Sequence, residues 1–427
     1  MAPCVLRVRA VLVAAVLALA AACATPSAPA PAAREAPVLR VGTSGDYPPF
    51  TLMREDGQVS GFDAALLEAY AAERGYRLEW VRFHWPGLVA DLTAHRFDLA
   101  ASGLTLRPER SLVGRYTVPV ARNGALVLLR RPAWAPAPAS PEAPLATLEA
   151  LDRPEFRLAV NLGGHLERVA RAHFRHARIL AIPGNAVREA LVSGQADALL
   201  TNTVEGPRWA EGLTGIEQVG PFTQDTVALY VEASRAELAA DLDTWLLAQE
   251  ASGALARWRE TYLGEGAREA TATPVDALLV ATAERLALMP RVAEAKRRAG
   301  VPLEVPEQEA RVLEAARRGV HQAARALGLP APSDESITAF FQAQMDAARQ
   351  VQARAPRTEG PAESLEALRA ALARISARIA TLVPRVPGGL APDALKRQSR
   401  AQLAASGLTP GECDRLAEAL AALGPAR

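Results

Sequence analysis

The stretch GFDAALLEAYAAERGYRLEWVRF, residues 61–83, decides the fold of the first half of the chain because it joins two kinds of element. In its first part apolar residues recur at spacings of three and four, which predicts an amphipathic helix ending at Gly75. Apolar residues then alternate over 76–83, which predicts a strand. The preceding LRVGTSG, residues 39–45, predicts another strand, so the segments form one strand–helix–strand unit.

This alternation of strand and helix patterns continues along the chain to about Gly264. It runs through residues 85–106, and a Pro-rich surface segment at 132–144 then interrupts it. A second series extends from FRLAVNLGG (156–164) to ADALLTNTVE (196–205). Two such series predict an α/β fold of two lobes, with largely parallel sheets and a cleft between the lobes.

No strand pattern remains after Thr271. Ala and Leu alternate with Arg and Glu at helical spacing to the end of the chain, with breaks at prolines. We therefore expect an α/β domain over residues 38–266 and an all-helical domain over residues 272–427. The sequence assigns no role to the tail after Pro392.

One helical stretch of this second half carries cations on an apolar face. Arg285, Met289, Val292 and Lys296 follow one another at spacings of four, three and four, which places them in one stripe. Buried cations need anionic partners, so with no acid in the stripe a bound anion is the natural partner. The alternative is that both cations extend from an ordinary helix into solvent.

The N-terminus and the overall charge limit where the protein works. The 427 residues include 48 Lys and Arg and 47 Asp and Glu, a formal net charge of +1 that argues against binding of nucleic acid or of a membrane surface. A short basic region, an apolar run and small residues predict an export signal over 1–22, followed by an Ala/Pro-rich tether over 23–37. We expect a periplasmic protein, either soluble or lipid-anchored at Cys23.

Four motifs of the first half resemble the periplasmic solute-binding proteins of the amino-acid class. In order along the chain they are GDYPPF (45–50), GFDAALL (61–67), SGLTLRPER (102–110) and QADALLTNTVE (195–205). The resemblance implies a two-lobed type II periplasmic-binding-protein fold. It also implies that Arg110 binds a substrate carboxylate bidentately, through two of its guanidinium nitrogens, with Ser102 and Thr105 as neighbouring donors. The alternative is that Arg110 only caps a loop.

Within that superfamily the chain is similar to cyclohexadienyl dehydratase, which converts prephenate to phenylpyruvate and often arogenate to phenylalanine. The motifs are TSGDYPPF (43–50), HWPGL (84–88), VNLGGHLERVAR (160–171) and TNTVE (201–205). The resemblance implies that Glu205 is the general acid and that no metal or cofactor takes part. The implied substrate-binding residues are Asp46, Trp85, Asn161, Thr201 and Asn202.

The first half also departs from the dehydratase pattern. His165 and Leu166 stand where Thr-Asn is expected, and Asn202 stands where Asp is expected. An Asp at that place would pair with a substrate ammonium. Its replacement by Asn202 therefore favours the keto acid prephenate over the amino acid arogenate.

The second half resembles the secreted all-helical class of chorismate mutase. Three segments carry the resemblance: AERLALMPRVAEAKRRAGVPLE (283–304), EARVLEAA (309–316) and ITAFFQAQMDAARQVQ (337–352). By this resemblance, Arg285 and Arg378 bind the carboxylates of chorismate, and Lys296 and Gln352 contact its ether oxygen. Glu309 is our candidate partner for the substrate hydroxyl. Val305 and Gln308 depart from the family, which expects Asp and Arg there.

Taken together, these patterns predict an exported bifunctional enzyme that makes prephenate from chorismate and converts it to phenylpyruvate. One rival reading is a solute-binding component of an uptake system that has no enzymatic activity. Another is a dehydratase whose mutase half has decayed. A solute-binding component has no use for a proton donor, so Glu205 distinguishes the first rival from an enzyme. Oligomers are possible, and the histidines do not form a metal-binding pattern.

Overall fold

The computed structural model describes residues 36–424 except 136–142, 184–185, 265–266, 268, 270 and 359–361. The predicted export signal, Cys23 and nearly all of the tether therefore lie outside the described residues. The described residues from Val38 onward form one compact unit, to which every element below belongs. None of the described helices is both long and apolar enough to span a membrane.

The first lobe is built on a five-stranded sheet of order β5-β1-β6-β15-β7. In that order its strands are Arg77–Arg82, Val38–Thr43, Leu99–Ala100, Tyr230–Glu232 and Gly114–Tyr116. β1 pairs in parallel with β5 and β6, whereas β15 is antiparallel to both of its neighbours. Helix α2 (Phe62–Arg74) buries its apolar face and ends at Gly75, whose φ of 70° is left-handed. The predicted strand–helix–strand unit is thus β1–α2–β5.

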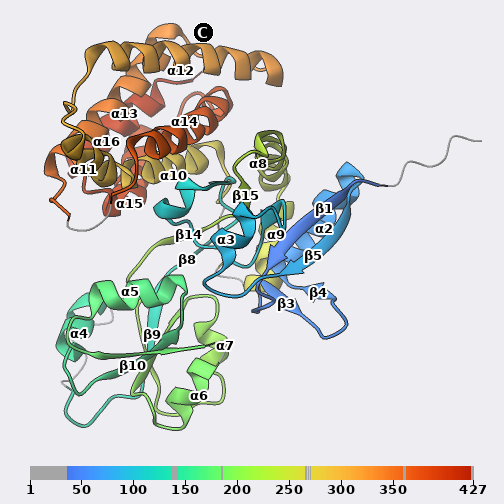
Figure 1. The fold of residues 1–427 in the computed structure, drawn as a ribbon, viewed down its shortest axis with the longest axis vertical. Helices are drawn as coiled ribbons and strands as arrows, with labels where there is room; N and C mark the ends of the chain where they lie inside the picture. Colours follow the sequence, from blue (N-terminus) through green and yellow to red (C-terminus); the bar gives the residue numbers. More distant parts are fainter. Residues whose placement is uncertain are drawn as a thin grey trace, which may run out of the picture. The chain divides into compact units, whose positions relative to one another are not determined.

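The second lobe, marked by β9 and β10 in Figure 1, contains another five-stranded sheet, of order β11-β10-β12-β9-β13. In that order its strands are Arg178–Ile182, Arg157–Asn161, Ala198–Asn202, Ala125–Leu129 and Glu217–Val219. Its helices are α4 (Pro144–Leu151), α5 (His165–His173), α6 (Val187–Val192) and α7 (Gly206–Ala210). β10, β11 and β12 run parallel, so the carboxyl ends of these strands meet at one edge.

Two short segments connect the lobes and complete the α/β part. The chain leaves the first lobe through β8 (Ala121–Asn123) and returns through β14 (Asp225–Val227), which pairs antiparallel with it. The remaining elements are β2 (Asp46–Tyr47), β3 (Thr51–Met53), β4 (Val59–Ser60), α3 (Leu88–Thr93), the 3₁₀ turn η1 (Pro108–Leu112), α8 (Ala236–Ala251) and α9 (Ala254–Leu263). This double crossover is the hinge that the two-lobed prediction requires.

After α9 every described element is a helix. They are α10 (Pro274–Ala287), α11 (Met289–Arg298), α12 (Pro306–Leu327), α13 (Asp334–Arg354), α14 (Leu365–Leu382), η4 (Val383–Arg385), α15 (Pro392–Leu403), η5 (Ala404–Ser406) and α16 (Pro410–Ala421). Thr273, Ser333, Ser364 and Thr409 cap four of them through side-chain oxygens. The stripe noted in the sequence crosses from α10 to α11, which begins just before Pro290.

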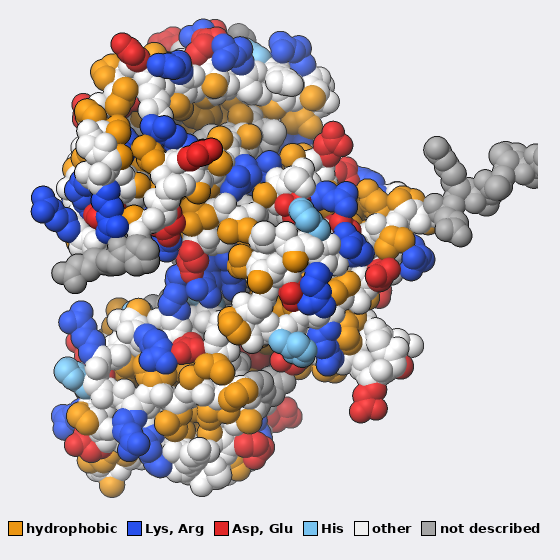
Figure 2. All heavy atoms as spheres, in the orientation of Figure 1, with side chains coloured by type: hydrophobic (Ala, Val, Ile, Leu, Met, Phe, Trp, Pro, Cys, Tyr) orange, Lys and Arg blue, Asp and Glu red, His pale blue; other side chains and the backbone are white. Residues whose placement is uncertain are grey.

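The apolar core is continuous between the first lobe and the helices. One buried cluster contains Leu229 and Leu255 of the α/β part together with Val275 and Leu278 of α10. On the face shown in Figure 2, charged side chains of both signs are scattered among apolar ones, as the near balance of 48 basic and 47 acidic residues leads one to expect.

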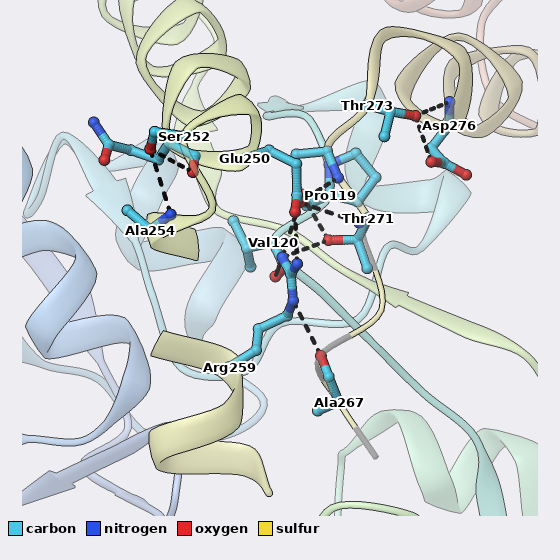
Figure 3. Close-up of polar contacts among 12 residues, drawn as sticks. Pro119, Val120, Glu250, Ser252, Ala254, Arg259, Ala267, Thr271, Thr273 and Asp276 are labelled. Atoms are coloured by element: carbon cyan, nitrogen blue, oxygen red, sulfur yellow. Dashed lines mark hydrogen bonds and ion pairs between the residues drawn. The ribbon is translucent and has the colours of Figure 1, made fainter. Parts of the chain in front are cut away.

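A buried ion pair holds the segment that joins α9 to α10 (Figure 3). Arg259, 0% exposed, donates to both carboxylate oxygens of Glu250, at 2.7 and 2.9 Å. Arg259 also donates to the Thr271 hydroxyl at 3.1 Å, and Glu250 accepts from the backbone N–H groups of Thr271 and Ala272. Because each charge is paired and hydrogen-bonded, the pair fixes the joining segment at low cost.

Removing one partner of this pair should destabilise the fold. In Glu250→Ala the guanidinium of Arg259 stays buried without its counter-charge, which costs about 3–5 kcal/mol. Urea denaturation of the full chain measures the loss. The matched control is Glu314→Ala, which removes an exposed i,i+4 pair with Arg318 and should change the free energy of unfolding by less than about 0.5 kcal/mol. Equal effects of the two substitutions would contradict the anchoring role.

Candidate active sites

A cavity of about 340 Å³ is lined by residues of both lobes of the α/β part. Eight of the nine residues predicted for the dehydratase site line it, namely Asp46, Trp85, Ser102, Thr105, Arg110, Asn161, Asn202 and Glu205. The ninth, Thr201, is fully buried and donates a hydrogen bond to Glu205. Asn161 ends β10 and Asn202 ends β12, so the cavity lies at the carboxyl edge of the second sheet.

Glu205 lies just before α7 and is 2% exposed. Its Oε2 accepts hydrogen bonds from the Thr201 hydroxyl at 3.1 Å and from the Asn202 amide at 3.3 Å. The Asn202 amide also donates to the Tyr47 hydroxyl at 2.7 Å, and the Asn202 side-chain oxygen accepts from the backbone N–H of Glu205. Asn202 therefore fixes the position of the carboxyl, a role that the sequence did not suggest.

The surroundings of Glu205 favour its neutral form. Burial raises the pKa of Glu205 to about 8, and the Asp46 carboxylate adds to the rise, whereas the hydrogen bonds from Thr201 and Asn202 oppose it. The carboxyl is consequently protonated at neutral pH. Both donors reach Oε2, so the acidic proton belongs on Oε1.

Arg110 enters the same cavity from η1 and is 6% exposed. Its guanidinium carbon lies 5.3 Å from the ring centroid of Trp85, a cation–π contact, and its Nη1 donates to the carbonyl oxygen of Thr105 at 3.3 Å. The Ser102 hydroxyl lies 2.7 Å from that of Ser44 and 3.1 Å from that of Thr51. Arg110 is thus oriented by protein groups and remains available to a ligand anion.

Two further polar groups of this cavity are Asn161 of the second lobe and Asp225 of the return crossover. The side-chain oxygen of Asn161 is buried, with no hydrogen-bond partner in the described part of the chain. Asp225, which the sequence analysis did not select, lines the cavity 3.2 Å from His165 Nε2 and accepts from the Thr223 hydroxyl at 2.8 Å. The His165 contact is close enough for an ion pair but lacks the alignment of a hydrogen bond. Asp225 could have been found by asking which residues the return crossover brings to the cavity.

A second cavity, of about 490 Å³, lies among α10 to α14. Arg285, Lys296, Glu309 and Gln352 line it, as do the divergent residues Val305 and Gln308. Arg285 is half-buried, because its side chain faces this cavity. Desolvation lowers the pKa of its guanidinium to about 10. Lys296 donates to the Leu303 carbonyl at 2.6 Å, and burial followed by the nearby Arg369 charge lowers its pKa. The stripe of cations therefore points into a cavity.

Two further cations line the second cavity and were not selected from the sequence. Arg349, one turn before Gln352 on α13, pairs with Glu309 at 3.2 Å, and Arg369 comes from α14. Gln352 is 7% exposed and donates its amide to the Met289 sulfur at 3.3 Å. Among the described lining residues, four cations therefore face one acid, Glu309, which suits a ligand with two negative charges.

The expectation for Arg378 is wrong, because this residue does not line the second cavity. It forms an ion pair with Glu284 and donates to the backbone carbonyls of Tyr116 and Thr117 in the α/β part. Arg369 lies nine residues earlier on α14, and at about 100° per residue nine positions put two side chains on opposite faces. The loose match to the family motif therefore selected Arg378, which lies on the face of α14 that points away from the cavity, and not Arg369.

The α/β part has the architecture of a two-lobed solute-binding protein. Residues 39–265 match the family of bacterial extracellular solute-binding proteins, family 3, and residues 273–353 match chorismate mutase type II. The first match spans more than half of the chain, so the protein belongs to family 3 of the bacterial extracellular solute-binding proteins. Its helical region begins with a chorismate mutase type II domain.

Individual proteins are similar to the α/β part of this chain. Cyclohexadienyl dehydratase of Pseudomonas aeruginosa is 34% identical over 233 residues, which cover 54% of this chain and 84% of the relative. An L-arginine-binding protein of the same organism is 26% identical over 236 residues, covering 52% and 87%. A solved ancestral amino acid-binding protein, described as a precursor of cyclohexadienyl dehydratase, is 28% identical with a TM-score of 0.47, covering 53% of this chain and 95% of its own.

The raised pKa of Glu205 predicts how stability depends on pH. A carboxyl whose pKa rises on folding binds more protons in the folded state, so its contribution to stability falls as the pH rises from its unfolded pKa towards about 8. Relative to Glu205→Gln, the wild type should lose up to about 1.4 kcal/mol per pH unit over that range. Thermal unfolding of both proteins between pH 5 and 8 measures the difference. Parallel curves would show that Glu205 ionises normally.

Proposed function

We propose that this protein catalyses two consecutive reactions, the rearrangement of chorismate to prephenate and the conversion of prephenate to phenylpyruvate, CO₂ and water. The observation that carries the proposal is that the carboxyl of Glu205, buried enough to raise its pKa to about 8, lies in the same cavity as Arg110. The dehydratase and mutase relationships support the same two steps, and the product of one is the substrate of the other.

The reaction in the dehydratase cavity needs one proton donor and one group that binds the side-chain carboxylate of the substrate. Arg110 binds the carboxylate of the pyruvyl side chain, in the bidentate geometry that guanidinium groups favour. Glu205 gives its proton to the ring hydroxyl, which leaves as water. The ring carboxylate on the opposite carbon leaves as CO₂, and its bonding electrons complete the aromatic ring. A carboxyl with a pKa of about 8 is protonated at neutral pH and can act as this acid.

In the helical cavity the rearrangement of chorismate needs no proton transfer. Arg285 and Arg369 bind the two carboxylates and so favour the compact conformer that reacts. Lys296 and the amide of Gln352 face the ether oxygen, on which negative charge grows as its bond breaks. Glu309, held by Arg349, accepts from the ring hydroxyl. Apolar residues such as Val292 and Phe341 complete the lining and exclude water.

The cavity between the lobes also supports a preference for the keto acid. Asn202 replaces a carboxylate expected to bind an ammonium, and Asp225 lies beside His165 and accepts a hydrogen bond from the Thr223 hydroxyl. The carboxylate expected to pair with a substrate ammonium is therefore missing at this position. Prephenate, which carries a keto group in its place, makes no such demand.

The alternative function is solute binding for an uptake system, which the relationship to an L-arginine-binding protein supports. The buried acid at Glu205 favours the enzyme, because a carrier gains nothing from a proton donor in its cleft. We further propose that the chain is exported to the periplasm, as the family to which it belongs is extracellular. Release as a soluble protein and lipid anchoring at Cys23 both fit that location.

Each step should depend on its own cavity. With chorismate supplied to purified protein, Glu205→Gln should lower phenylpyruvate formation by about 100-fold or more and let prephenate accumulate. Lys296→Ala should lower prephenate formation by about 100-fold and spare turnover of added prephenate. Following the two products separately measures both effects. The matched controls are Glu211→Gln, at the far end of α7, and Lys396→Ala, on α15, and neither should change either rate.

The substrate preference is tested with prephenate and arogenate side by side. The wild type should show a kcat/KM for prephenate at least about tenfold above that for arogenate, the scale of one unmet ionic contact. His165→Asn removes the partner of Asp225 and should raise the relative kcat/KM for arogenate. His176→Asn, in the exposed turn after α5, serves as the control. Equal use of both substrates by the wild type would refute the preference.

A further inference from the structure

Three consecutive residues of the turn η1 contact three different parts of the molecule. Glu109 forms ion pairs with Arg107 and with Arg168 of the second lobe. Arg110 lines the dehydratase cavity. Ser111, 2% exposed, donates its hydroxyl to Glu284 Oε1 of α10, at 2.6 Å. This short turn therefore places the carboxylate-binding cation beside a direct contact with the helical region.

The helical region holds η1 and the following strand through more than this one bond. Arg374 of α14 donates to the backbone carbonyls of Ser111 at 3.0 Å and Leu112 at 2.9 Å. Arg378, 10% exposed, pairs with Glu284 Oε2 and donates to the carbonyl of Tyr116 on β7. Glu284, itself 2% exposed, thus uses both of its oxygens, one for each half of the chain.

The same contact lies one residue from both candidate sites. Ser111 follows Arg110 of the dehydratase cavity, and Glu284 precedes Arg285 of the mutase cavity. The main-chain carbonyl oxygen of Arg110 accepts a hydrogen bond from the Tyr230 hydroxyl at 2.7 Å. A 3₁₀ turn of five residues has few hydrogen bonds of its own, so its position depends on such external contacts.

We infer that Glu284, although it belongs to the mutase region, is a positioning residue of the dehydratase site. Through Ser111 it fixes η1, and η1 sets the direction of the Arg110 guanidinium. The inference rests on the proposed function only in that the cavity binds prephenate through Arg110. It makes the helical region a structural requirement for full dehydratase affinity.

Two substitutions break this link in different ways. Ser111→Ala removes the hydroxyl and leaves the Glu284–Arg378 pair intact. Glu284→Gln removes the charge and replaces one of the two acceptor oxygens with an NH₂ donor, so the separate oxygens that serve Ser111 and Arg378 are no longer both acceptors. Each should raise KM for prephenate about tenfold, the scale of one hydrogen bond to a charged group, and change kcat by less than about threefold, as expected when uniform binding is lost. The double variant should be little worse than the poorer single one, because both remove the same link.

The control is Thr244→Ala, which removes a 2.9 Å hydrogen bond from Arg385 to α8 between the same two regions but does not touch η1. It should leave KM for prephenate unchanged. Partial unfolding would lower the apparent kcat and leave KM unchanged. A rise in KM at nearly constant kcat therefore indicates a lost positioning contact and not a loss of folded protein. An unchanged KM in Ser111→Ala and Glu284→Gln, or an equal rise in Thr244→Ala, overturns the inference. Failure of the wild type to convert prephenate would reject the proposed function instead, and prephenate affinity measured by calorimetry on the same variants would still test Glu284.

Discussion

The buried pair of Arg259 and Glu250 determines where the α/β part ends and the helices begin. Its two charges are removed from water, yet they pair with each other; Arg259 also donates to the Thr271 hydroxyl, and Glu250 accepts from the backbone N–H groups of Thr271 and Ala272. Because α10 starts at Pro274, only two residues later, the pair also sets the direction of the helix that carries Glu284 and Arg285. The pair therefore helps to place the helix that makes the contact with η1 and forms one wall of the mutase cavity.

The two cavities use desolvation in opposite ways. Between the lobes, burial keeps Glu205 protonated, so that an ordinary carboxyl becomes an acid that works at neutral pH. Among the helices, burial lowers the pKa of Arg285 only to about 10, so the guanidinium stays charged at neutral pH and needs an anion. A neutral acid with one anchoring cation suits the loss of hydroxide and CO₂, whereas an excess of cations suits a rearrangement that develops negative charge.

Sequence patterns predicted most of the dehydratase cavity but less of the mutase cavity. Asn202 and Glu205 stand in a motif that follows a recognisable strand, so their place at a sheet edge could be foreseen, whereas Arg110 of η1 was found from its own motif. The cations of α14 could not be separated in this way, because Arg369 and Arg378 both fit a weak helical pattern. Only the packing of α14 against two different neighbours shows that one serves the cavity and the other the α/β part.

The amino-acid sequence by itself determined the order of strands and helices, the change from an α/β to an all-helical region near Thr271, and the types of residue in both sites. These are local properties, set by the spacing of apolar residues and by short motifs. The tertiary structure alone decided that Asp225 faces His165 and that Glu284 connects Ser111 to Arg378. Such contacts join residues far apart in the chain, whose meeting depends on how whole elements pack, and no periodicity in the sequence records that packing.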